Sequence, residues 1–134
     1  MAEEAVVKEM LTQEMIQAGA ALTRRLDEAH LEVGASLWLY MPDKNLWRLI
    51  VASPAVGQDG PKKVYQQIHT ILSKMSDKTW KIPLHDISVV EDSDPLIASL
   101  RTSMGTKNGI LGRRFSRDTI NGHFIEDAYI YKMT

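Results

Sequence analysis

The stretch from residue 35 to residue 52 constrains the fold more than any other part of the chain. Two apolar runs, 35–41 and 46–52, flank the short polar segment 42–45, which predicts a β-hairpin with a four-residue turn. If Met41 pairs with Leu46, alternate residues point to opposite faces. One face then carries Leu37, Leu39, Met41, Leu46, Arg48 and Ile50, and the other carries Trp38, Tyr40, Trp47, Leu49 and Val51. Because both faces are mainly apolar, the hairpin must lie inside a layered fold or have one face covered by a partner.

Three helices are predicted from apolar residues that recur at spacings of three and four. The first covers residues 12–30, with Thr12 as its N-cap. The second begins at Pro61, after a loop over 53–60, and the third begins at Asp94 and Pro95. Their apolar stripes are Met15, Ala18, Leu22, Leu26 and Ala29, then Val64, Ile68, Ile71, Leu72 and Met75, then Leu96, Ile97, Leu100 and Met104.

Three further strands complete the predicted order α-β-β-α-β-α-β-β. One covers 82–90, and the runs 110–120 and 123–132 flank Asn121-Gly122, a strong signal for a type I′ hairpin turn. The 134 residues suit one α+β domain with a mixed or antiparallel sheet of about five strands. Residues 1–11 are expected to extend the first helix, to form a flexible leader, or to dock on this domain or on a partner subunit.

Composition excludes several classes of function. The net charge of −1 gives no overall attraction to nucleic acid or to an acidic membrane. The chain has no cysteine, which excludes thiolate metal sites and thiol nucleophiles and fits a reducing compartment. Glu3 and Glu4 stand where a secretory signal would be basic, and no apolar run approaches membrane-spanning length. We therefore expect a cytoplasmic protein with no membrane association.

No metal or cofactor site is predicted. His85 and Asp86 are neighbours in a predicted strand, so their side chains point to opposite faces and cannot chelate together. His30 and His69 lie on predicted helices without a ligand residue three or four positions further on. His30 and His69 are each interpreted as a surface or boundary residue.

A basic segment is the first candidate binding feature. Between Pro95 and Arg117 there are five cations and no acid, with glycines that would let the backbone approach an anion. Lys62 and Lys63 add positive charge in the first turn of the second helix. The predicted anion-binding set is Arg101, Lys107, Arg113, Arg114, Arg117, Lys62 and Lys63. A nucleic acid or phosphate ligand is one interpretation, and a solvated strand edge protected from aggregation is the other.

The terminal hairpin offers a catalytic interpretation. The predicted pairing puts His123 on one face with Asp118, Asp127 and Arg114. His123 would then be a general base, Asp118 or Asp127 its orienting carboxylate, and Arg114 an oxyanion or phosphate clamp, as in a small hydrolase or nuclease. Cross-strand charge matching is the structural alternative, and it is favoured because all four residues come from one local pairing.

Aromatic residues and the apolar leader favour a third interpretation. Trp38, Tyr40 and Trp47 share one hairpin face, and Val7 and Leu11 are too apolar for a plain tail. These five residues are the predicted interface, since tryptophan and tyrosine are common anchors of protein interfaces. The leading hypothesis is a non-enzymatic binding or regulatory module, either a homodimer or an accessory subunit. Nucleic-acid or phosphate binding and hydrolysis remain the alternatives.

One resemblance concerns the fold. A helix, a gap ending in glycine and a hairpin from Ser36 to Ser53 together resemble the opening of GAF-type sensor domains. The resemblance covers residues 12–53 and contains no ligand-binding motif. It implies an architecture and no activity.

Overall fold

A five-stranded mixed sheet with the order β3-β2-β1-β5-β4 organises the α+β fold. The computed structural model describes residues 7–75, 80–105 and 110–134. The elements are α1 (Gln13–Glu28), β1 (Ala35–Met41), β2 (Leu46–Ser53), α2 (Pro54–Asp59), α3 (Pro61–Lys74), a 3₁₀ turn (Leu84–Asp86), β3 (Ile87–Glu91), α4 (Pro95–Met104), β4 (Arg113–Ile120) and β5 (His123–Met133). The predicted fold class is confirmed, and the element order is as predicted except for one additional short helix, α2. Within the described residues, no helix is long and apolar enough to cross a membrane.

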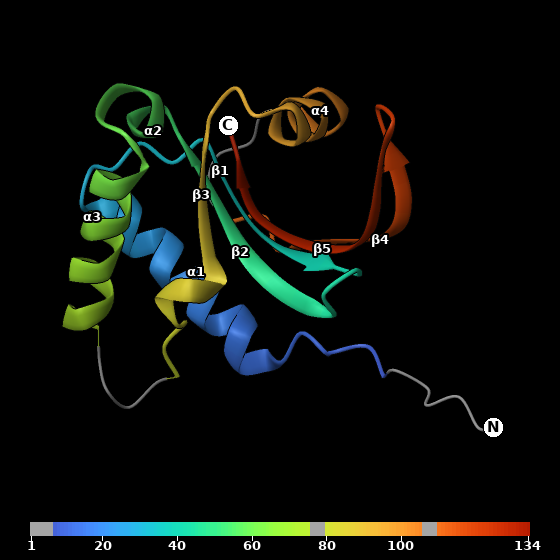
Figure 1. The fold of residues 1–134 in the computed structure, drawn as a ribbon, viewed down its shortest axis with the longest axis horizontal. Coiled ribbons are helices and arrows are strands. Elements are labelled where there is room, and N and C mark those ends of the chain that lie inside the picture. The colour runs from blue at the N-terminus through green and yellow to red at the C-terminus, as the bar shows by residue number, and fades with distance from the viewer. Residues whose placement is uncertain (1–6, 76–79, 106–109) are drawn as a thin grey trace.

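The β1–β2 hairpin has the predicted register, with Met41 opposite Leu46. Its two faces enter two separate apolar cores. Trp38 and Leu49 belong to the first core, which they share with α1 and α3, and Leu37 and Ile50 belong to the second, which they share with α4 and β5. Figure 1 shows α1 and α3 on one side of the sheet and the β4–β5 hairpin curving around α4 on the other. The chain itself therefore covers both apolar faces.

The helix ends follow the predicted chemistry. Thr12 accepts a hydrogen bond from the Met15 N–H at the start of α1, and Asp94 accepts one from the Leu96 N–H at the start of α4. At the end of α1, His30 has a φ of 61°, and the Leu31 N–H bonds to the Leu26 carbonyl. This is a Schellman motif with histidine at the position where glycine is usual.

The predicted loop over 53–60 is wrong, because it contains the short helix α2. Ser53 caps this helix by accepting a hydrogen bond from the Ala55 N–H, and Pro54 occupies its first position. Proline is favoured there because its missing N–H has no partner within a helix. The same reasoning predicted the start of α3 at Pro61 and would have predicted α2.

The third strand is shorter than predicted. The 3₁₀ turn occupies 84–86, and β3 begins at Ile87, where it pairs in parallel with β2. This parallel pair makes the sheet mixed. The outer edge of β3 is partly closed by α3, because the Val89 N–H donates to the Tyr65 hydroxyl. Ile82 is also buried, although it lies outside any strand.

The β4–β5 hairpin has the predicted turn and register but not the predicted faces. Asn121 and Gly122 both have positive φ, and Ser116 lies opposite Asp127. Arg117 has a φ of 50° and is left out of the strand pairing. The alternation of faces also fails along β5, because Ile125 packs in the second core while Asp127, two residues further on, contacts Lys8 on the other side of the sheet. This break lies opposite Arg117.

Candidate functional site

Residues 7–11 lie across one face of the sheet, and we call this segment the strap. The strap has no regular secondary structure. The Asn45 side chain binds its backbone twice, accepting from the Glu9 N–H at 2.8 Å and donating to the Val7 carbonyl at 2.9 Å. The Trp47 indole N–H donates to the Glu9 carbonyl at 2.9 Å. These three bonds recognise an extended backbone without regard to its side chains.

The orientation of the Asn45 side chain is fixed by its backbone conformation and by Tyr40. It lies in the β1–β2 turn with a φ of 49°, a conformation that asparagine tolerates better than most residues. The Tyr40 hydroxyl donates to its side-chain oxygen at 2.6 Å. The amide is thereby fixed with its oxygen toward the Glu9 N–H and its nitrogen toward the Val7 carbonyl.

A second set of contacts surrounds the Lys8 side chain. The Lys8 ammonium lies 2.7 Å from Asp127 Oδ2, 4.7 Å from the centre of the Tyr40 ring and 5.9 Å from a ring centre of Trp47. Both ring distances are within the range of cation–π attraction. The ammonium therefore sits between a carboxylate and two aromatic side chains.

Asp127 is 3% exposed and binds three partners. Arg114 approaches it with two nitrogens, Nε at 2.6 Å from Oδ1 and Nη2 at 2.7 Å from Oδ2, and Ser116 donates to Oδ1 at 3.2 Å. Burial alone would raise the pKa of the Asp127 carboxyl. The hydrogen bonds and positive charges of Arg114 and Lys8 outweigh burial and lower this pKa to about 2.

The strap is bound through its backbone at residues 7–9 and through the Leu11 side chain, and two of its other apolar side chains are exposed. Leu11 is 9% exposed and belongs to the first core, next to the start of α1. Val7 and Met10 are 79% and 78% exposed. A cavity of about 270 Å³ remains between the strap and the sheet, bordered by Trp47, Arg114 and Asp127. The apolar side chains of the strap thus do not all serve to hold it to this chain.

The predicted interface residues divide into three groups. Trp38 is fully buried, and its indole N–H donates to the Met15 carbonyl, so it belongs to the core. Tyr40 and Trp47 lie beneath the strap, and Leu11 anchors it. Val7 faces solvent. The sequence prediction identified these residues but missed Lys8 and Asn45, because a lysine in a leader and an asparagine in a turn are both ordinary.

The four catalytic candidates do not converge. Arg114 and Asp127 form the ion pair described above. His123 instead lies on the side of α4, where its Nδ1 is 3.1 Å from the Ser99 hydroxyl. Asp118 is exposed and lies opposite Ile125. His123 and Asp127 therefore face different sides of the hairpin.

The predicted anion-binding residues are also dispersed. Arg101 is bound to Asp92 and to the Thr134 carbonyl, and Arg114 is bound to Asp127. Arg113 stacks over Phe115. Lys107 lies outside the described residues.

Two elements that carry basic residues also lie far apart. Lys62 and Lys63 begin α3, whereas Arg113 and Arg117 lie on β4. α3 packs against β3 at one edge of the sheet, and β4 forms the opposite edge (Figure 1). These basic residues therefore do not form one surface.

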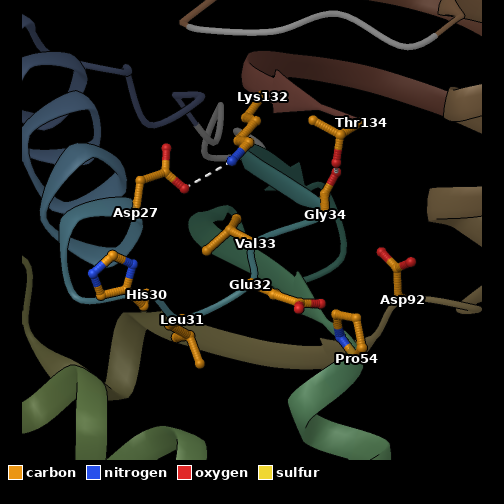
Figure 2. Close-up of a pocket in the computed structure, with 10 residues that line it drawn as sticks. All are labelled: Asp27, His30, Leu31, Glu32, Val33, Gly34, Pro54, Asp92, Lys132 and Thr134. Carbon is orange, nitrogen blue, oxygen red and sulfur yellow. Dashed lines mark hydrogen bonds and ion pairs between the residues drawn. The ribbon is translucent and has the colours of Figure 1, made fainter.

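A second pocket, of about 520 Å³, lies where the end of α1 meets the start of β1 and the end of β5 (Figure 2). Asp27 pairs with Lys132 at 2.7 Å, and Asp92 pairs with Arg101 at 2.8 Å. Gly34 packs closely against the Asp92–Arg101 pair, because a Cβ at this position would displace the Asp92 carboxylate. The first pair joins α1 to β5, and the second joins the segment after β3 to α4. The pocket is lined by Asp27, His30, Leu31, Glu32, Val33, Gly34, Pro54, Asp92, Lys132 and Thr134.

Comparisons of the chain with protein-family models, with curated proteins and with solved structures find no match. In the part of the chain that the structure describes, no three histidine or acidic side chains are grouped so that they could hold a metal ion. Functional assignment therefore depends on the strap and the residues that bind it.

Proposed function

We propose that the protein is a non-enzymatic binding module that holds an extended peptide segment on the sheet beside Tyr40, Asn45 and Trp47. The groove formed by these three residues together with Arg114 and Asp127 is called the strap groove. In the structure it holds the chain's own residues 7–9. The occupant we propose in the functional complex is an extended segment of a partner protein.

The observation that carries this proposal is the pair of bonds from Asn45. In an extended chain the N–H of one residue and the carbonyl two residues before it point to the same side. The Glu9 N–H and the Val7 carbonyl are such a pair, and one amide side chain binds both. Recognition through the backbone, with a pocket for one side chain, is how many domains bind extended peptides.

The position of the strap also supports the proposal. It is not part of the sheet or of any helix, and of residues 7–11 Leu11 alone belongs to either core. Displacing residues 7–10 would therefore leave most of the core packing intact. Under this proposal the protein is an accessory or regulatory subunit, and we place it in the cytoplasm because its sequence lacks cysteine.

A peptide titration tests the proposal on the full chain. The double variant Lys8→Ala with Glu9→Pro removes the ammonium and one backbone donor of the strap without changing a groove residue. An acetylated and amidated peptide with the sequence of residues 7–11 should bind it with a dissociation constant of about 1 mM or lower. Binding should shift the NMR resonance of the Trp47 indole N–H, which donates to the Glu9 carbonyl in the native contact.

The matched control adds Asn45→Ala to the same double variant. It removes the amide that binds two backbone groups, so binding should weaken at least about tenfold, from the loss of two hydrogen bonds. Because alanine is strained at the φ of 49° and leaves the Tyr40 hydroxyl without its Asn45 partner, the fold of the variant is checked by circular dichroism before the titration. A folded double variant whose Trp47 signal stays fixed at several millimolar peptide would rule out the proposed function.

A further inference from the structure

We infer that the strap groove selects lysine at one position of its peptide ligand, and that Lys8 of the chain acts as an intramolecular competitor for the same pocket. This inference rests on the proposed function and specifies the ligand and the regulation of the same groove. The strap then serves as a built-in substitute for the partner's segment.

The lysine preference follows from how Asp127 is occupied. Arg114 forms a bidentate interaction with this carboxylate, with one short hydrogen bond to each oxygen, and Ser116 donates a third hydrogen bond to Oδ1. The remaining contact is made at Oδ2 by the compact Lys8 ammonium. A guanidinium binds a carboxylate best through two parallel hydrogen bonds to its two oxygens. Arg114 already binds Asp127 in this way, so a second arginine should fit less well than lysine.

The aromatic side chains strengthen the preference for a cation. The Lys8 ammonium lies near both Tyr40 and Trp47, whose rings lie 5.4 Å apart between their centres. An uncharged side chain of similar length would keep the apolar contact with these rings but lose the attraction to the carboxylate and to the ring faces. Methionine in place of lysine is therefore the informative change in the peptide.

The pocket can be vacated without leaving a buried unpaired charge. When the ammonium departs, Asp127 keeps its two bonds to Arg114 and one to Ser116. The Lys8 side chain is 42% exposed in the docked state and can return to water. The groove residues Asn45 and Trp47 lie on the rigid central hairpin, so the empty groove should keep its shape.

Competition follows from the short tether between the strap and the core. Leu11 is packed in the first core, three residues after Lys8. A segment held this close has an effective concentration in the millimolar range at the groove. A peptide in solution must compete with the strap at this effective concentration. The natural chain should therefore bind the peptide about tenfold more weakly than the Lys8→Ala, Glu9→Pro variant does.

The test compares three peptides on the natural full chain and on the double variant. The peptides have the sequence of residues 7–11 with lysine, arginine or methionine at the second position. On the double variant we expect the lysine peptide to bind at least about tenfold more tightly than the methionine peptide, with arginine between them. Because the change lies in the peptide, protein folding is the same in all three titrations.

Each other outcome has a distinct meaning. Equal affinities for the lysine and methionine peptides would overturn lysine selection and leave the proposed function standing. Equal affinity of the natural chain and the double variant for the lysine peptide would overturn the intramolecular competition. Absence of binding by all three peptides would overturn the proposed function, and this inference with it.

Discussion

The two hairpins of the sheet differ in burial, in charge and in the regularity of their backbone. In β1–β2 the register is uninterrupted and both faces enter apolar cores. In β4–β5 the outer strand is mostly exposed, carries three arginines and contains one residue, Arg117, with left-handed backbone. The central hairpin supplies rigidity, and the outer hairpin supplies charge. The strap groove lies where they meet, with Tyr40 and Trp47 from the first and Arg114 and Asp127 from the second.

The difference also explains the basic segment. β4 is an edge strand, and an exposed edge invites pairing with another chain. Charged side chains and an interrupted backbone are common ways to prevent this. Arg113 and Arg117 lie on this edge, and the interruption at Arg117 distorts it. The structural interpretation of these arginines therefore accounts for their placement better than a common anion-binding surface does.

The largest contrast should come from removing one aromatic side chain from each hairpin. Trp38 is fully buried in β1, and its indole N–H is bonded to the Met15 carbonyl. Trp38→Ala should lower the free energy of unfolding by about 3–5 kcal/mol. Phe124 of β5 is 62% exposed, so Phe124→Ala should change it by less than about 0.5 kcal/mol. Urea denaturation of both variants measures this, and comparable losses would refute the contrast.

A smaller effect should appear in the pH dependence of stability. The folded-state pKa of Asp127 is lowered to about 2 from its ordinary value of 3.8, so the carboxylate stabilises the fold above pH 4 and this contribution is lost as the pH falls to 2. The loss should amount to about 2 kcal/mol. It is measured as the difference between the natural chain and the Asp127→Asn variant across this range.

Asp118 of the same hairpin is the control for that measurement. Its side chain is exposed on β4, so Asp118→Asn should change the free energy of unfolding by less than about 0.5 kcal/mol. If the natural chain and the Asp127→Asn variant showed parallel profiles, the ion pair with Arg114 and Lys8 would not contribute to stability. The comparison thus separates the buried charge of β5 from the solvated charge of β4.

Sequence reasoning succeeded where local chemistry decides the structure. The N-caps Thr12 and Asp94, the turn at Asn121-Gly122 and the hairpin register at Met41 all follow from short-range rules, and all are confirmed. The two-faced hairpin correctly predicted a layered fold. It left open whether a partner or the chain itself covers the faces, because this depends on where α1, α3 and α4 pack.

The strap groove could be predicted only in part. Tyr40, Trp47 and Leu11 were identified because aromatic and apolar residues stand out in a sequence. Lys8 and Asp127 are 119 positions apart, and no periodicity connects them. The face of Asp127 was predicted correctly relative to Arg114 but not relative to His123, since nothing in the sequence indicated that the alternation of faces breaks between Ile125 and Asp127.

The smallest expected effect tests the interruption at Arg117 directly. Arg117 has a φ of 50°, where a residue with a Cβ is strained, and its nitrogen is 3.7 Å from Glu126 with the side chain 82% exposed. Arg117→Gly should therefore raise the free energy of unfolding by about 0.5 kcal/mol, since relief of strain exceeds the added entropy of the unfolded chain. Arg117→Lys keeps the charge and the strain and should be neutral. A loss of stability in the glycine variant, measured by the same denaturation, would mean that the side chain rather than the backbone governs this position, and the two hairpins would then differ in charge alone.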